Sequence, residues 1–339
     1  MAAREKRRAE SSDDGLAAVR HTATGELRPR DVYYSSADNL RLYAADYGDP
    51  LSPWLPVVCL PGLTRSSRDF HQLATYLAGH RHRPRRILAF DYRGRGKSEW
   101  DKNPAGYNPL TEMADVLAGM AATGVSRAVI VGTSRGGIIG MLMAIDRPGA
   151  VAGLVLNDVG PSIEALGLAR IRAYVGRTPV PDDWTDAAHI QRRLHGGLFT
   201  AWGDEDWDAF ARLTYREEEG HPQSDYDPAL AGTLDGVELD REMPSLWNEF
   251  SALHAIPVLS IRGENSDLLS HATVARMARE HPALSTISVP NEGHPPLLVR
   301  SSLLSRISAF ITALEGSGPS AEAVIPQESP AFNLDARDD

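Results

Sequence analysis

Short apolar runs alternate with amphipathic stretches along most of this chain. Six runs read as strands: Val57–Leu60, Ile87–Phe90, Ala128–Val131, Val151–Leu156, Ile256–Ile261 and Ser285–Val289. The stretches between them repeat apolar residues at helical spacing, as at Met113, Val116, Leu117 and Met120. Strands that alternate with helices predict an α/β fold with a parallel sheet and right-handed crossovers. An antiparallel hairpin over residues 32–44 is expected to open the fold.

The alternation stops at Pro161 and resumes only near Ile256. The intervening residues have an irregular, helical pattern and hold four of the six tryptophans, Trp184, Trp202, Trp207 and Trp247. The stretch from Ser162 to Phe250 contains 18 acidic and 8 basic residues, a net charge equal to the −10 of the whole chain. Residues 1–30 and 316–339 are polar or rich in Gly, Pro, Ser and Ala, and we expect both to be disordered tails.

Composition narrows the class of protein. The chain has 339 residues, of which 42% are hydrophobic and 24% charged, as in soluble globular proteins. Its apolar runs are too short to span a bilayer, and no N-terminal segment resembles a secretion signal, so a cytoplasmic protein is expected. The negative charge argues against nucleic acid as a partner. Cys59 is the single cysteine, which excludes an internal disulfide and provides no metal-binding pair.

The strongest candidate for chemistry is Gly132-Thr133-Ser134-Arg135-Gly136, which fits G-x-S-x-G. A predicted strand precedes it and an apolar helix follows it, and this is the context of a nucleophile elbow. Glycine is expected two residues before and after the serine because so sharp a turn leaves no room for Cβ atoms. The turn also places the serine at a helix N-terminus, where developing negative charge is favoured.

Two further loops follow predicted strands and so lie at the same edge of the sheet. Asn291-Glu-Gly-His294 follows the last strand, and Arg262-Gly-Glu-Asn-Ser-Asp267 follows the one before it. A serine hydroxyl becomes a good nucleophile when an imidazole takes its proton and a carboxylate orients that imidazole. We therefore predict His294 as base and Asp267 as acid. Glu264 and Asp158 compete with Asp267 for the acid role.

An oxyanion hole needs two N–H donors. The backbone N–H of Arg135, next to the nucleophile, is the first candidate. Leu63, after the strand that ends in Pro61-Gly62, is expected to supply the second.

These motifs, together with Phe90-Asp-Tyr-Arg-Gly-Arg-Gly-Lys-Ser98, resemble the α/β-hydrolase superfamily over about residues 31–315. The chain looks like the capped bacterial branch of esterases, lactonases, proline iminopeptidases and carbon–carbon bond hydrolases. The resemblance implies an eight-stranded, mostly parallel sheet with helices on both faces. It also implies a core of residues 31–161 and 255–315, and a helical lid of residues 162–254 inserted after strand 6.

The expected function is hydrolysis of a carboxylic ester or lactone of a small, largely apolar molecule, without cofactor or metal. The lid tryptophans suggest an apolar or aromatic ligand, or they form the lid's own core. Carbon–carbon bond hydrolysis and iminopeptidase action are the alternative reactions. A ligand-binding or signalling protein on the same scaffold is the alternative of another class. The sequence does not indicate an oligomeric state or a substrate-binding residue.

Overall fold

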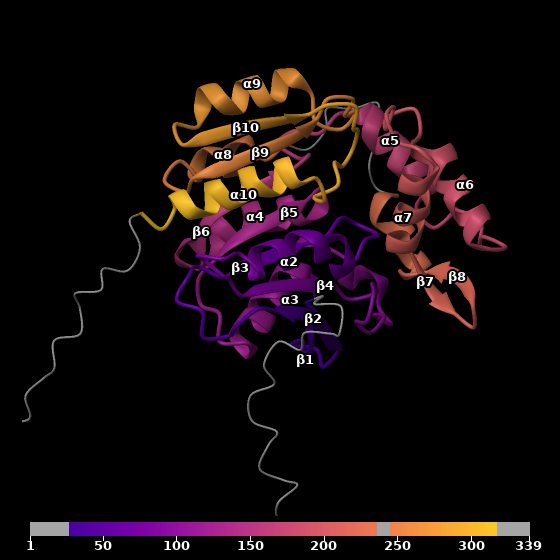
Figure 1. Cartoon of the computed structure of the whole chain (residues 1–339), viewed down its shortest axis with the longest axis horizontal. Helices are drawn as coiled ribbons and strands as arrows, with labels where there is room; N and C mark the ends of the chain where they lie inside the picture. Colours follow the sequence, from indigo (N-terminus) through magenta and orange to yellow (C-terminus); the bar gives the residue numbers. More distant parts are fainter. Residues whose placement is uncertain (1–26, 236–244, 317–339) are drawn as a thin grey trace, which may run out of the picture.

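The computed structural model describes residues 27–235 and 245–316. The two predicted tails therefore fall almost entirely outside the described residues. Eight strands form one sheet in the order β1-β2-β4-β3-β5-β6-β9-β10 (Figure 1). Only β2 runs antiparallel to its neighbours, β1 and β4, and the other strand pairs are parallel. This confirms the predicted mostly parallel, eight-stranded sheet.

The strands of this sheet are β1 (Arg30–Ser35), β2 (Arg41–Tyr47), β3 (Val57–Leu60), β4 (Ile87–Asp91), β5 (Ala128–Thr133), β6 (Val151–Asn157), β9 (Val258–Gly263) and β10 (Leu284–Val289). Every residue of β3, β4, β5, β6 and β9 is buried. Central strands covered on both faces need apolar residues at every position, and this explains the continuous apolar runs in the sequence.

Helices cover both faces of the sheet. The core helices are α2 (His71–Ala78), α3 (Pro109–Ala122), α4 (Arg135–Asp146), α8 (Trp247–Ala252), α9 (His271–Glu280) and α10 (Ser301–Ala313). One apolar cluster joins α2 and α10 to the sheet, and a second joins α3, α4, α8 and α9. Short 3₁₀ turns lie at Ser67–Phe70, Pro104–Gly106, Pro148–Ala150 and, in the segment after β6, Pro228–Leu234 (η4).

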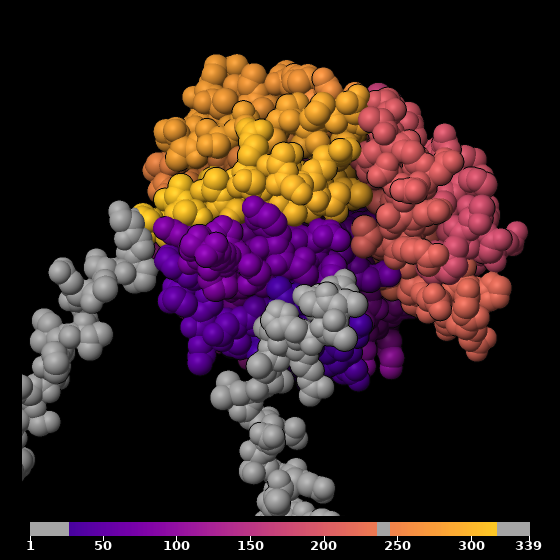
Figure 2. Space-filling model, viewed as in Figure 1, coloured from indigo at the N-terminus to yellow at the C-terminus, as the bar shows by residue number. Residues whose placement is uncertain are grey.

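The segment after β6 packs against one side of the core, as Figure 2 shows. It comprises α5 (Ala165–Tyr174), α6 (Trp184–His195), α7 (Asp204–Thr214), the hairpin β7 (Tyr215–Glu218) and β8 (His221–Ser224), and η4. Residues 162–235 are called the lid below. It is not wholly helical, because β7 and β8 pair as an antiparallel ribbon.

Helix α8 corrects the expected end of the lid. It falls within the expected lid of residues 162–254, but it packs against α4 of the core. Phe250 on α8 is fully buried, and its ring lies 5.3 Å from that of His281, which follows α9. Trp247 and Phe250 are three residues apart and form one apolar face of α8. Such a face can pack in a lid as well as in a core, so the sequence alone could not assign this helix to either.

The tightest packing in the core surrounds the turn between β5 and α4. A Cβ atom on Gly136 would lie 2.0 Å from the carbonyl oxygen of Leu60 in β3. A Cβ atom on Gly132 would lie 2.4 Å from the backbone of Gly136. Backbone therefore meets backbone at this point, and only glycine allows the approach.

Gly136→Ala should strongly destabilise the protein, because the Leu60 backbone cannot move without breaking the sheet. We expect a cost of at least about 3 kcal/mol, measured as a drop in Tm. Gly149→Ala is the control, since a Cβ atom added there would have no other atom within 4 Å, and its effect should stay within about 0.5 kcal/mol. Equal Tm values for the two variants would contradict this explanation.

Candidate active site

Ser134 sits on a strained turn at the carboxyl end of β5. Its backbone has φ 50° and ψ −113°, which a non-glycine residue seldom adopts. The Ser134 N–H donates to the Asn157 carbonyl at 3.0 Å, which fixes the turn to the end of β6. Helix α4 begins with the next residue, so Ser134 stands at its N-terminus.

His294 and Ser134 contact each other as the sequence predicts. The Ser134 hydroxyl lies 2.9 Å from His294 Nε2. The other ring nitrogen, Nδ1, lies 2.8 Å from Oδ2 of Asp158. Both His294 and Asp158 are buried. A serine, an imidazole and a carboxylate are thus joined in one hydrogen-bonded chain.

The carboxylate in this chain is Asp158, not Asp267, and this corrects the preferred prediction. Asp158 follows β6, and its left-handed backbone, φ 57°, turns it into the site. Its Oδ1 accepts from the Gly263 N–H at 2.8 Å, and its Oδ2 accepts from the Ser266 hydroxyl at 2.6 Å as well as from His294. Three donors compensate the burial of this charge.

Asp267 and Glu264 serve other contacts. Asp267 forms a two-point ion pair with Arg170 of α5, at 2.6 and 2.9 Å. Glu264 accepts from the Asn291 N–H at 3.1 Å. In the loop after β9 it is Ser266, one residue before Asp267, that donates a hydrogen bond to Asp158. The sequence does not indicate which of two neighbouring residues in this loop, Ser266 or Asp267, turns toward His294.

The two predicted oxyanion donors flank Ser134. Arg135 is the first residue of α4, and a helix leaves its first N–H groups without intrahelical partners. Leu63 follows Gly62, where an added Cβ atom would lie 3.9 Å from the Ser134 Cβ. Within the described residues neither the Leu63 N–H nor the Arg135 N–H donates a hydrogen bond. Both are available to a developing negative charge.

A buried ion cluster lies behind these donors. The fully buried Arg95 donates from Nε to the Leu63 carbonyl at 2.8 Å, which fixes the peptide beside the expected oxyanion donor. Arg95 is also 2.7 Å from Glu112 of α3, and the second Glu112 oxygen accepts from Arg135 Nε at 2.8 Å. One carboxylate therefore ties the loop after β4 to the start of α4.

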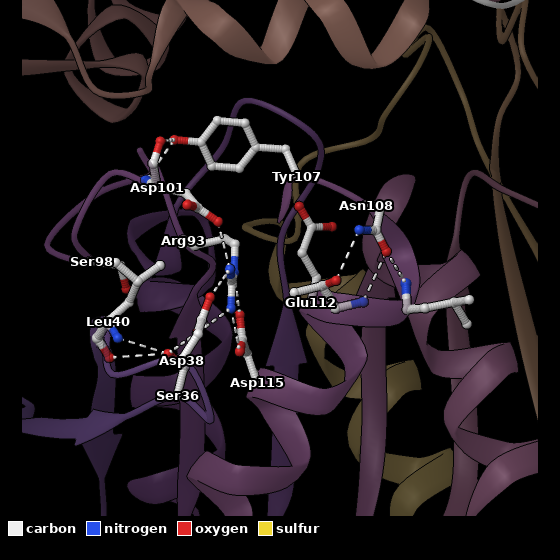
Figure 3. Close-up of polar contacts among 12 residues, drawn as sticks. Ser36, Asp38, Leu40, Arg93, Ser98, Asp101, Tyr107, Asn108, Glu112 and Asp115 are labelled. Carbon is white, nitrogen blue, oxygen red and sulfur yellow. Dashed lines mark hydrogen bonds and ion pairs between the residues drawn. The ribbon is translucent and has the colours of Figure 1, made fainter. Parts of the chain in front are cut away.

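A neighbouring arginine, Arg93, fixes the same loop. Figure 3 shows its guanidinium among the carboxylates of Asp38, Asp101 and Asp115. The contact with Asp115 uses two N–H groups, at 2.7 and 2.9 Å. Because Arg93 is buried and fully paired, we assign it to support of the loop and not to substrate binding.

A cavity opens between the core and the lid at the Ser134–His294 pair. Core residues Gly62, Leu63 and Pro295 line one side. Lid residues close the other, among them Ile171, Tyr174, Val175, Leu194, His195, Phe199, Phe210 and Tyr226. None of the four lid-region tryptophans lines it: Trp184, Trp202 and Trp207 join one apolar cluster inside the lid. Their role is packing, the second of the two interpretations that the sequence allowed.

The one cation lining the cavity, within the described part of the chain, is Arg65. Asp69 accepts from two of its N–H groups, at 2.5 and 2.8 Å, and its guanidinium also contacts Thr214. Residues 27–235 and 245–316 contain no cluster of three or more His, Cys, Asp or Glu that could hold a metal ion. None of their helices has the length and apolar character needed to cross a membrane.

Comparison with known proteins shows the family of the chain. The sequence profile of the alpha/beta hydrolase family matches residues 57–302. The chain belongs to the alpha/beta hydrolase family. It is 32% identical to the 3-hydroxybutyrate-oligomer hydrolase of Cupriavidus necator over 281 residues, 80% of this chain and 93% of that protein. A 2-(acetamidomethylene)succinate hydrolase of Mesorhizobium japonicum is 28% identical, over 69% of this chain and 79% of its own length.

Among solved structures, an alpha/beta hydrolase from Novosphingobium aromaticivorans superimposes with a TM-score of 0.77 and 37% identity. The match covers 84% of this chain and 98% of that one. These likenesses, with the family match, identify the chain as a hydrolase.

The two aspartates should respond very differently to replacement by asparagine. Asp158→Asn should lower kcat on any ester substrate by about 10³–10⁴-fold, because the amide no longer fixes the His294 tautomer. Asp267→Asn should lower kcat by no more than about tenfold, since it weakens only the lid ion pair with Arg170. Steady-state kinetics on one activated ester test this. The reverse order of effects would return the acid role to Asp267.

Glu112→Gln should lower the stability of the protein and loosen the segment around Leu63, the predicted oxyanion donor. It leaves two arginines, Arg95 and Arg135, without their carboxylate, which typically costs about 3–5 kcal/mol. We expect a clearly lower Tm, and a larger fall in kcat than rise in KM because the Leu63 peptide loses its support. The exposed Glu205→Gln is the control. A Glu112→Gln variant with unchanged Tm and kcat would show that the cluster stabilises neither the fold nor the position of Leu63.

Proposed function

We propose that this chain is a serine hydrolase that cleaves carboxylic esters of small, largely uncharged substrates through an acyl-enzyme. The observation that carries the proposal is the hydrogen-bonded chain of Ser134, His294 and Asp158 at the floor of the lid cavity. The free N–H groups of Leu63 and Arg135 beside it complete the machinery for acyl transfer.

The reaction follows from this geometry. Ser134 Oγ attacks the ester carbonyl carbon while His294 Nε2 takes the hydroxyl proton. The carbonyl oxygen gains negative charge and is held by the N–H groups of Leu63 and Arg135. Asp158 accepts from His294 Nδ1–H and stabilises the imidazolium. His294 then donates the proton to the leaving alcohol. In the second half of the reaction, water attacks the acyl-enzyme while His294 takes its proton, and His294 returns that proton to Ser134 as the acid leaves.

The cavity supports an uncharged substrate. Its lid wall is mainly apolar, and its one described cation, Arg65, is already paired with Asp69. A dicarboxylate would therefore find no unpaired positive charge on the described lining, which disfavours a substrate like the succinate derivative named for one relative. The relative named for 3-hydroxybutyrate oligomers, matched over 93% of its length, favours short hydroxyacyl esters. Lactones share the same carbonyl chemistry and are the second substrate class.

A panel of p-nitrophenyl esters from acetate to decanoate tests the proposal. We expect multiple turnover with the highest kcat/KM on short acyl chains, because the lid closes over the cavity. Ser134→Ala should lower kcat by at least about 10⁴-fold at unchanged Tm. Absence of turnover above the Ser134→Ala background on every ester and on lactones would overturn the proposal and favour carbon–carbon bond hydrolysis or a non-catalytic role.

A further inference from the structure

A second histidine shares the cavity with the catalytic pair. His195 is the last residue of α6 in the lid, its side chain is only 8% exposed, and it lines the same cavity as Ser134 and His294. The edges of two rings hold it in place, with centroids of Tyr174 at 5.4 Å and Phe210 at 5.8 Å. The reaction described above makes no use of this side chain.

The protonation of the His195 ring follows from its neighbour Arg170. An Arg170 Nη1 atom lies 3.4 Å from His195 Nδ1. A guanidinium can only donate, so Nδ1 must accept and the ring hydrogen must reside on Nε2. Burial, together with the charge of Arg170, lowers the pKa of His195 to about 3, so the ring is neutral at pH 7.

The Nε2–H of His195 is then a hydrogen-bond donor on a side chain that lines the cavity. Within the described residues no hydrogen bond is made by this atom. A donor without a protein partner, on a residue that lines the cavity, is available to a ligand in that cavity. Asp267 holds Arg170 with two hydrogen bonds, and its charge offsets part of the charge of Arg170 beside the His195 ring.

We propose that His195 Nε2–H donates a hydrogen bond to a second, neutral oxygen acceptor of the substrate, such as a carbonyl distant from the bond that is cleaved. This rests on the proposed ester hydrolysis and narrows its substrate class to esters that carry another carbonyl group. Asp267 and Arg170 are positioning residues in this arrangement, because they act on the substrate only through His195.

Matched substrates separate this role from general packing. p-Nitrophenyl 3-acetoxybutyrate places a second carbonyl on the acyl side, and p-nitrophenyl 3,5-dimethylhexanoate is its carbon isostere. The corresponding pair on the alcohol side is methyl 3-(butyryloxy)butyrate and 4-methylhexan-2-yl butyrate. Hydrolysis of this pair is measured as the release of butyrate. Wild type should prefer the oxygen-bearing member in at least one pair, measured as the ratio of kcat/KM values.

His195→Phe keeps an aromatic ring but removes the donor. In the pair that wild type discriminates, it should reduce the preference for the oxygen-bearing ester by about tenfold, the value of one hydrogen bond. His195→Gln offers an amide N–H near the position of Nε2 and should restore part of the preference. His189→Phe, an exposed position on the same helix, should leave the ratio at the wild-type value.

The outcomes distinguish the two proposals. Turnover of all four esters with the same ratios in wild type and His195→Phe would overturn the role of His195 and leave ester hydrolysis intact. No turnover of any ester by wild type would overturn the proposed function itself. Loss of the preference in His195→Phe with recovery in His195→Gln supports both.

Discussion

The buried carboxylate of Asp158 is the interaction on which the site depends. Its two oxygens accept from Gly263 at the end of β9, from Ser266 in the loop that follows, and from His294 after β10. Removal of this charge from water would be costly without such donors. Because the donors come from separate segments, the same contacts that satisfy the charge also hold the ends of three strands in register. His294 is oriented by a carboxylate whose own hydrogen bonds require the fold to be complete.

The fold and the contact between Ser134 and His294 could be predicted from the sequence for a clear reason. Strands buried on both faces must be apolar throughout, and the carboxyl ends of parallel strands meet at one edge. Ser134 directly follows β5, and His294 lies in the loop after β10, so their meeting could be expected. Asp158 and Asp267 also follow strands, and the choice between them depends on a left-handed backbone at Asp158 and on which residue of the β9 loop turns inward. Neither detail leaves a signal in residue type.

The lid was harder to predict because tertiary contacts decide its arrangement. Its tryptophans pack on one another, with Trp202 and Trp207 ring centroids 4.8 Å apart, and so make a small core within a segment of high negative charge. The residues that line the cavity form no pattern in the sequence. Helices α5 and α6 bring Arg170 against Asp267 and His195, and they place His195 in the lining of the cavity that holds Ser134 and His294. A lone histidine in an acidic helical stretch carries no such information.

The loop after β4 joins the lid to the oxyanion donors. The lid docks on it through backbone bonds, from Gly96 N–H to the Asp225 carbonyl at 2.9 Å and from Asp227 N–H to the Gly94 carbonyl at 2.8 Å. Between these two glycines stands Arg95, whose guanidinium holds the Leu63 carbonyl. A displacement of the lid at this contact would therefore act on the same short segment that supports the Leu63 peptide. The backbone contacts of the lid and the Arg95 contact with the Leu63 carbonyl therefore share one short segment, Gly94 to Gly96.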